Sequence, residues 1–172
     1  MGTVPALDPA FPKGRAYDLS VRFAQTGAGR WFGINIASRI DPLLLRLTGG
    51  RTGSFPQGKV VLLNVRGRKS GEPRTTPLLY FTEGDDVILI ASSFGRERHP
   101  AWYHNLVAHP DCELRVGTQG GRYQAQEVAD ERERRRLYDK SYALYAGYEG
   151  YEERAGAVGR RIPVMRLTPV EP

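Results

Sequence analysis

Arg68, Lys69 and Arg74 place three positive charges around one hydroxyl, that of Ser70, in a short stretch near the middle of the chain. Arginine offers a planar fork of donors and lysine a compact point charge, so together they can hold an anion by hydrogen bonds and by Coulomb attraction. A phosphate or a polycarboxylate has the charge and the oxygen atoms to accept from all of them. The residue types therefore predict an anion-binding turn at 68–74.

This basic segment lies between two runs that are typical of β-strands, at 59–65 and 75–82. Gly67 and Gly71 permit a tight turn with left-handed backbone. The same residue types also fit a solvated hairpin turn that binds nothing. The turn chemistry alone does not choose between an anion site and a bare turn.

The chain has 172 residues, of which 40% are hydrophobic and 26% charged, a balance typical of one globular domain with a substantial core. Its formal net charge of +6 fits a partner with several negative charges, either a nucleic acid or a polyanionic small molecule. The single Cys112 excludes an internal disulfide. His99, His104 and His109 are five residues apart, on different faces of any one helix, so we expect no metal site.

An apolar segment that also carries arginines, Trp31 to Leu47, precedes the basic turn. Its composition fits a helix that packs on the core or between two copies of the chain, and it also fits contact with an anionic membrane surface. No uninterrupted apolar run approaches the roughly 20 residues that span a bilayer, and the first residues lack a signal-peptide pattern. We expect a cytoplasmic protein, with a homodimer or a peripheral membrane contact through 31–47 left open.

About six runs of alternating or apolar residues predict β-strands. They lie at 59–65, 75–82, 86–91, 112–116, 121–128 and 162–167. Helices are predicted at 99–107, and from a cap at Asp130 to about Tyr145. Strands that follow one another without strict strand–helix alternation favour an α+β fold, mainly β: an antiparallel, barrel-like sheet with inserted helices and an N-terminal helical segment.

The order of these elements and of several separated motifs resembles the deazaflavin-dependent nitroreductase family. The motifs are Gly67-Arg68-Lys69-Ser70-Gly71-Glu72-Pro73-Arg74, Ala91-Ser92-Ser93, His99-Pro100-Ala101-Trp102-Tyr103-His104-Asn105-Leu106 and His109-Pro110. The resemblance runs from Trp31 to the C-terminus and holds in spacing as well as in order. We therefore expect a partly disordered N-terminal arm at 1–30 and a split β-barrel deazaflavin-binding domain at 31–172.

The same resemblance implies a cofactor and a reaction. The cofactor is coenzyme F420, an 8-hydroxy-5-deazaflavin whose phosphate and polyglutamate tail are strongly anionic. The reaction is hydride transfer from its reduced form to a small-molecule acceptor, which is a quinone, a conjugated enone or a nitroaromatic. Arg68, Lys69 and Ser70 match the positions that hold the cofactor phosphate, and Arg74 matches a basic position that pairs with the phosphate or with the tail.

Other matched positions lie beside the deazaflavin ring in the family. They are Pro77, Tyr80, Ala91, Ser92 and Trp102. Trp102 also fits a plain core anchor. After Ser92 the chain has Ser93-Phe94-Gly95 where family members often carry Lys-Gly-Gly, a departure that would remove one phosphate or tail contact and let Phe94 narrow the pocket.

Tyrosine recurs at every third position in Tyr145, Tyr148 and Tyr151. Helical core packing explains such a spacing, whereas the intervening glycines weaken a helix and fit a mobile aromatic lid over a flat ligand. By the resemblance, the three tyrosines are substrate-binding residues. Tyr148 and Ser92 are then the candidate catalytic residues, whose hydroxyls would stabilise or protonate the anion that develops on the acceptor.

The residue types also fit two other functions. A related flavin enzyme with a split barrel would hold FMN, with the same basic turn gripping its one phosphate. The arginine-rich run at 132–136 could instead form a nucleic-acid surface, but it is interleaved with acids and no nucleic-acid motif is present, so no nucleic acid is expected. No pattern in the chain identifies the physiological acceptor.

Overall fold

The computed structural model of the chain describes residues 3–10, 26 and 60–170. The N-terminal helical segment predicted at 31–47 lies outside these residues, and so does the membrane or dimer contact expected there. Most of the arm expected at 1–30 lies outside them too. Of the helices that are described, none is long and apolar enough to cross a membrane.

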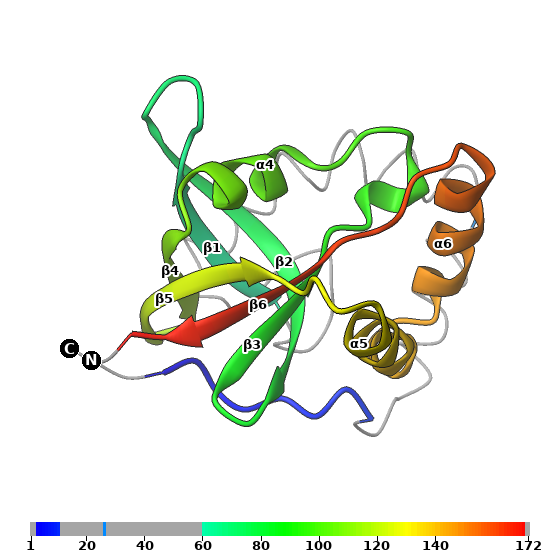
Figure 1. Cartoon of the computed structure of the whole chain (residues 1–172). Helices are drawn as coiled ribbons and strands as arrows, with labels where there is room; N and C mark the ends of the chain where they lie inside the picture. Colours follow the sequence, from blue (N-terminus) through cyan, green and yellow to red (C-terminus); the bar gives the residue numbers. More distant parts are fainter. Residues whose placement is uncertain (1–2, 11–25, 27–59, 171–172) are drawn as a thin grey trace.

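Six antiparallel strands close into a barrel (Figure 1). They are β1 (Val60–Arg66), β2 (Pro73–Glu83), β3 (Asp86–Ile90), β4 (Asp111–Val116), β5 (Gln119–Glu127) and β6 (Val164–Pro169). Around the barrel the order is β1-β2-β3-β6-β5-β4, and pairing of β1 with β4 closes it. The predicted α+β barrel, mainly β, is confirmed, and every predicted strand overlaps an observed one.

Alternating burial explains why these segments form barrel strands. In β1, Val61, Leu63 and Val65 are buried while the residues between them are only partly buried, as expected for a strand with one face toward a core. The β2–β3 hairpin turns at Gly84, whose φ of 61° suits a two-residue hairpin loop. The apolar run of β1 and the glycine of this turn are both visible in the sequence, so these strand positions could be predicted.

Helices and one short 3-10 turn connect the strands. They are η2 (Ser93–Gly95), α4 (Ala101–Ala108), α5 (Glu131–Leu144) and α6 (Gly147–Ala157). Asp130 caps α5 as predicted, because its carboxylate accepts a hydrogen bond from the Glu133 N–H at 2.8 Å. The backbone is extended at Tyr145 (φ −150°), and α6 starts at Gly147. The segment with Tyr148 and Tyr151 is therefore a second helix, whereas the interpretation as a mobile aromatic lid predicted a weakened helix.

The apolar core has two parts, on opposite faces of the sheet. The barrel interior is filled by strand side chains together with Trp102 and Leu106 of α4. The outer core lies outside the barrel against α5 and α6, and it contains Phe81, Ile88 and the tyrosines of α6. Figure 1 shows α5 and α6 together on this flank, away from α4 and the β1–β2 turn.

Residues 5–7 of the N-terminal arm lie along β2. The Tyr80 hydroxyl donates a hydrogen bond to the Pro5 carbonyl at 3.0 Å. The Leu7 N–H donates to Thr82 Oγ1 at 2.9 Å, and the Leu7 carbonyl accepts from the Thr82 N–H at 3.0 Å. This part of the arm is therefore held on the barrel by backbone and side-chain hydrogen bonds.

Three of the four arginines in the arginine-rich run on α5 have acidic partners. Arg134 pairs with Glu131 at 2.6 Å and Arg135 pairs with Glu152 at 2.8 Å. Arg136 pairs with acids of α5 and of the β2–β3 hairpin. A nucleic acid would have to displace these carboxylates, so the run offers little unshared positive charge to a polyanion.

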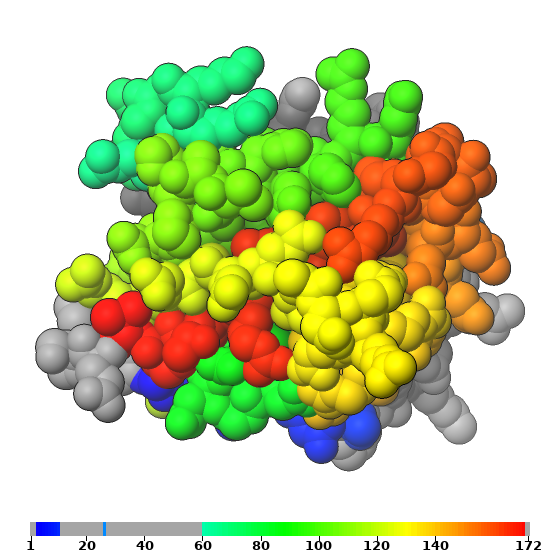
Figure 2. Space-filling view, viewed as in Figure 1, coloured from blue at the N-terminus to red at the C-terminus, as the bar shows by residue number. Residues whose placement is uncertain are grey.

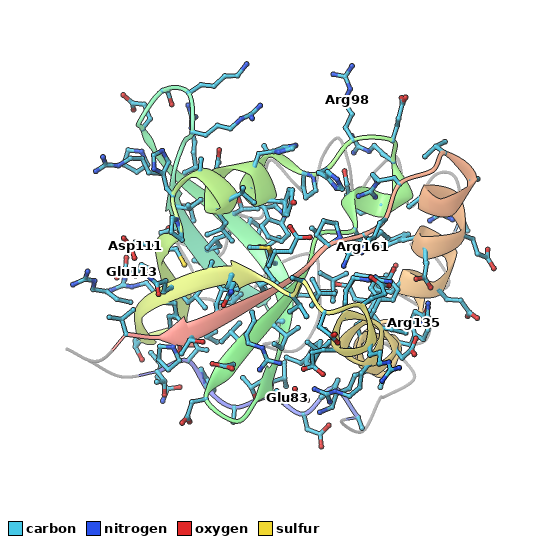
Figure 3. The ribbon with its side chains drawn as sticks, in the orientation of Figure 1. Glu83, Arg98, Asp111, Glu113, Arg135 and Arg161 are labelled. Carbon is cyan, nitrogen blue, oxygen red and sulfur yellow. The ribbon has the colours of Figure 1, made fainter. Side chains whose placement is uncertain are left out.

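An ion-pair network joins the β2–β3 hairpin to α5 and β6, and Figure 3 shows Glu83 at the hairpin end below α5. Glu83 accepts hydrogen bonds from Arg136 Nη1 and Lys140 Nζ, both at 2.9 Å. Arg166 of β6 lies 3.5 Å from the same carboxylate. The hydrogen bonds from Arg136 are the main reason why the pKa of Glu83 is lowered from 4.5 to about 2.

We expect Glu83→Gln to lower the free energy of unfolding at neutral pH by about 1–2 kcal/mol, because it removes the shared carboxylate of this network. The folded-state pKa is the depressed one, so the network stabilises the fold above about pH 4.5 and loses this effect as the pH falls toward about 2. Urea unfolding in steps from neutral pH down to about pH 3 should show the gap between variant and wild type shrinking.

Glu113→Gln is the matched control for this measurement. Glu113 is exposed and lies 4.0 Å from Arg115, so we expect almost no change in stability. Equal destabilisation by the two substitutions, or a gap for Glu83→Gln that does not depend on pH, would contradict the role given to the network.

Candidate functional site

The basic turn between β1 and β2 is held by its own backbone. The Gly67 N–H donates to the Glu72 carbonyl and the Gly71 N–H to the Gly67 carbonyl, both at 2.8 Å. Gly71 uses the left-handed conformation that glycine permits, with a φ of 71°. Gly67 does not use it. Close packing favours glycine there instead, because a Cβ would lie 3.0 Å from Ser70 Oγ and 3.2 Å from the Glu72 carbonyl oxygen.

A pocket of about 510 Å³ lies between this turn and α4. Its lining residues are Gly67, Arg68, Lys69, Ser70, Arg74, Thr75, Thr76, Ala101, Trp102 and Asn105. Asn105 joins the two walls, because its Oδ1 accepts a hydrogen bond from the Arg68 N–H at 3.1 Å. In the space-filling view the end of the β1–β2 hairpin protrudes from the upper left of the surface (Figure 2).

The pocket is positively charged, and no acidic side chain lines it. Arg68, Lys69 and Arg74 form no ion pair with any residue in the described part of the chain. Arg74 Nη2 donates to Ser70 Oγ at 3.4 Å, and the same oxygen accepts from the Glu72 N–H at 3.3 Å. Exposed cations that share no carboxylate can pair with a bound anion, so the residues present fit a phosphate-bearing ligand.

Several sequence-predicted cofactor residues meet in this pocket, namely Arg68, Lys69, Ser70, Arg74 and Trp102. Trp102 is 7% exposed and belongs to the barrel core, so it is a core anchor and a pocket wall at once. Thr75, Thr76 and Ala101 also line the pocket and were missed. The available signal for these residues was their position in the sequence, next to the predicted cofactor residues Arg74 and Trp102.

Pro77 and Tyr80 lie farther along β2, outside the pocket lining. Their odd separation in a strand puts the two side chains on opposite faces of the sheet. Tyr80 points into the barrel core, where burial and the nearby Tyr123 raise the pKa of its hydroxyl to about 12. Contact of either residue with a deazaflavin ring stays a prediction. Because the two side chains lie on opposite faces of the sheet, they cannot both contact the ring from one face.

Ala91 and Ser92 follow β3, apart from the basic pocket. Ala91 is fully buried, and its N–H donates to the Pro163 carbonyl at 3.0 Å. The Ser92 carbonyl accepts from the Gly95 N–H at 2.9 Å. We call residues 91–95 the β3 corner. The chain runs from this corner through 96–100 into α4, so one continuous segment links the corner to the pocket wall.

The β3 corner is strained and closely packed on α6. Ser93 and Phe94 have φ values of 50° and 57°, which are uncommon for residues with side chains. At Gly95, a Cβ would lie 2.7 Å from the Tyr151 carbonyl oxygen. Phe94 packs edge-on against the Tyr151 ring, with centroids 5.7 Å apart. The departure from Lys-Gly-Gly thus gives this corner an aromatic contact with α6.

The three predicted substrate-binding tyrosines lie close together. Tyr148 and Tyr151 belong to α6, and Tyr145 lies between α5 and α6. The ring centroids of Tyr145 and Tyr148 are 5.6 Å apart, and those of Tyr148 and Tyr151 are 5.9 Å apart. The hydroxyls of Tyr145 and Tyr151 lie 3.4 Å apart, and burial raises the pKa of both. All three side chains are buried in the outer core, and Tyr151 brings this aromatic cluster against the β3 corner.

The histidines do not lie as the sequence suggested. His99 precedes α4, and its ring centroid lies 5.8 Å from that of His104. The two histidines do not share one helix, so the argument from helix faces does not apply to them. Within residues 3–10, 26 and 60–170, no group of three or more His, Cys, Asp or Glu side chains could hold a metal ion.

A protein-family model described as F420H(2)-dependent quinone reductase matches residues 36–169. An F420H(2)-dependent quinone reductase of Mycobacterium tuberculosis is 43% identical over 81 residues, which cover 46% of this chain and 54% of that protein. A second protein of the same organism is 37% identical over 109 residues, 63% of this chain and 88% of that protein. The chain thus spans about half the length of the first of these relatives.

Two solved structures share the fold. One described as an F420-H2 dependent reductase (FDR-A) has a TM-score of 0.56 at 30% identity, covering 63% of this chain and 93% of that one. Another, described as a domain-swapped dimer, has a TM-score of 0.58 at 26% identity, covering 75% and 96%. The predicted split β-barrel is thereby confirmed.

Proposed function

Because the chain belongs to the F420H(2)-dependent quinone reductase family, we propose that it binds coenzyme F420 and passes a hydride from the reduced cofactor to a quinone. The unshared cations of the basic pocket carry this proposal. Arg68, Lys69 and Arg74 suit a ligand with a phosphate and a polyglutamate tail. FMN, the alternative cofactor, has one phosphate and no such tail, so it would leave more of this charge without a partner.

When bound, the reduced deazaflavin supplies the hydride. In this proposal the basic pocket anchors the phosphate end, and the ring lies toward the β3 corner. The hydroxyls of Ser92 and Tyr148 stabilise or protonate the negative charge that develops on the acceptor. Tyr145 and Tyr151 shape the acceptor site, and their buried position limits the access of water to it.

A quinone is the acceptor that we favour over a conjugated enone or a nitroaromatic. A flat quinone ring can pack edge-on or offset against tyrosine rings, as the cluster on α6 already does among its own members. The name of the M. tuberculosis relative supports the same choice. The enone and the nitroaromatic are then the competing acceptors for a screen with the reduced cofactor.

We also propose that the chain forms a homodimer and acts in the cytoplasm. The solved structure described as a domain-swapped dimer supports pairing of two copies. Contact of residues 31–47 with a membrane surface stays a prediction from the sequence.

The test of the cofactor is a titration with oxidised coenzyme F420 and, separately, with FMN, following the quenching of tryptophan fluorescence. Trp102 lines the pocket, so a bound chromophore should quench it. We expect F420 to bind at least about tenfold more tightly than FMN, because its tail adds contacts worth about 1.4 kcal/mol. A preference for FMN would move the chain to the flavin enzymes, and binding of neither would make the basic turn structural only.

A further inference from the structure

Arg160 is buried behind the β3 corner, although it belongs to neither the basic pocket nor any motif singled out in the sequence. The residue is 9% exposed. Its Nη1 donates to the Ala91 carbonyl at 3.3 Å and to His99 Nδ1 at 3.1 Å, and its Nη2 donates to the Ser92 carbonyl. Its Nε is also buried and has no hydrogen-bond partner in the described part of the chain.

None of these partners carries a negative charge. Arginine has only donors, so His99 Nδ1 must accept, and His99 is then neutral with its proton on Nε2. Burial and the nearby guanidinium lower the pKa of His99, which agrees with a neutral ring. No carboxylate of residues 3–10, 26 or 60–170 pairs with Arg160. Arg134, buried as well, differs because Glu131 lies 2.6 Å from it.

A buried cation without a counter-ion is costly, because the carbonyl dipoles around it replace only part of its hydration. Burial lowers the pKa of the Arg160 guanidinium for this reason, although an arginine side chain stays charged. The backbone strain at Ser93 and Phe94 adds a second cost at the same place. Two such costs at one corner are typical of a functional site.

We propose that Arg160 is a positioning residue whose unshared charge stabilises negative charge on the ring of a ligand seated against the β3 corner. This inference rests on the proposed function, which puts the deazaflavin ring there. The carbonyls of Ala91 and Ser92 fix the guanidinium directly behind the corner. A ring seated on the other side of this backbone would be close enough to feel the charge, because salt largely screens charges only beyond about 10 Å.

The ring of coenzyme F420 can report this charge without turnover. Its 8-hydroxyl is conjugated with the ring, so loss of the proton leaves a delocalised anion and changes the visible absorption. A nearby cation favours the anion and lowers the pKa of this hydroxyl. The oxidised cofactor is therefore a probe of the electrostatic potential at the corner.

The test is a pH titration of the visible absorption of oxidised F420 bound to wild type, Arg160→Gln and Arg160→Lys. Glutamine keeps a hydrogen-bond donor and removes the charge, whereas lysine keeps the charge. We expect the ring hydroxyl to hold its proton about tenfold more tightly in Arg160→Gln than in wild type, a shift of about one pH unit. Arg160→Lys should restore most of the wild-type titration.

Arg154→Gln is the matched control, because it removes an exposed cation from the same corner. Arg154 Nε donates to the Phe94 carbonyl at 3.4 Å, and solvent screens its charge. We therefore expect Arg154→Gln to shift the pKa of the bound ring hydroxyl by less than about half of the shift in Arg160→Gln. An unchanged titration in Arg160→Gln, with the cofactor bound, would overturn the proposal and leave Arg160 as an anchor for the backbone.

A second measurement keeps the proposal testable if Arg160→Gln does not fold. In wild type, the bound ring hydroxyl must lose its proton at a lower pH than the hydroxyl of the free cofactor. Loss at the same or a higher pH overturns the role of Arg160 while the binding itself still supports the cofactor. Failure of wild type to bind F420 at all would instead overturn the proposed function, and this inference with it.

Discussion

A chain that carries Arg68→Gln together with Lys69→Gln should bind coenzyme F420 about 100-fold more weakly than wild type at low salt. Each substitution removes one charge-assisted contact with the phosphate or the tail, and about 1.4 kcal/mol for each contact corresponds to a factor of ten. Both side chains are exposed, so the fold should be retained. The Arg68 N–H that binds Asn105 is also kept, which leaves the pocket walls joined.

The measurement is the fluorescence titration with oxidised F420, repeated at several salt concentrations. Wild-type affinity should fall steeply with salt, and the double variant should respond less because fewer charges take part. Thermal unfolding without ligand should give nearly equal midpoints for the two proteins. If the difference in affinity between wild type and the double variant stays the same at high salt, the substitutions have damaged the pocket and the loss is not due to the missing charge.

Arg122→Gln together with Arg132→Gln is the control for net charge. Both arginines are exposed, neither lines the pocket, and their loss changes the total charge by the same amount. We expect this pair to weaken binding by no more than about threefold. An equal effect of the two double variants would mean that the overall +6 charge attracts the cofactor and that the pocket does not select it.

The barrel and the basic turn could be predicted because their signals are local. A run of apolar residues marks β1, and the Gly84 turn fixes the β2–β3 hairpin. The cations at 68–74 lie in one turn, so their proximity follows from sequence separation alone. Trp102 reaches the same pocket only because α4 packs across the barrel end, and for that residue the family resemblance supplied what local pattern could not.

The features that the sequence did not predict depend on contacts between residues, which a local sequence pattern does not show. Gly67 permits a left-handed backbone that the turn does not use, and it is the close contact with Ser70 and with the Glu72 carbonyl that disfavours a side chain there. The helix α6 forms despite three glycines, because its tyrosines are buried against the outer core and tertiary packing outweighs intrinsic propensity. Arg160 lies far in sequence from the β3 corner that it contacts, so only the fold shows it.

Tyr148→Phe should lower kcat with a quinone acceptor by about 100-fold while changing F420 affinity by less than about threefold. The substitution removes only the hydroxyl, so the ring contacts with Tyr145 and Tyr151 remain. A proton donor or a hydrogen bond to developing charge typically contributes this much to turnover. Cofactor binding depends on the basic pocket, which Tyr148 does not line.

Tyr142→Phe is the matched control, since it removes a hydroxyl from the same aromatic group. The Tyr142 hydroxyl donates to Glu152 Oε2 at 2.7 Å, and its ring packs edge-on against Tyr138. Its loss should cost about 1 kcal/mol of stability and leave kcat within about twofold of wild type. Steady-state kinetics with reduced F420, together with urea unfolding, separate the two effects. Wild-type kcat in Tyr148→Phe, or an equal loss of kcat in both variants, would remove Tyr148 from the reaction and leave it a packing residue of α6.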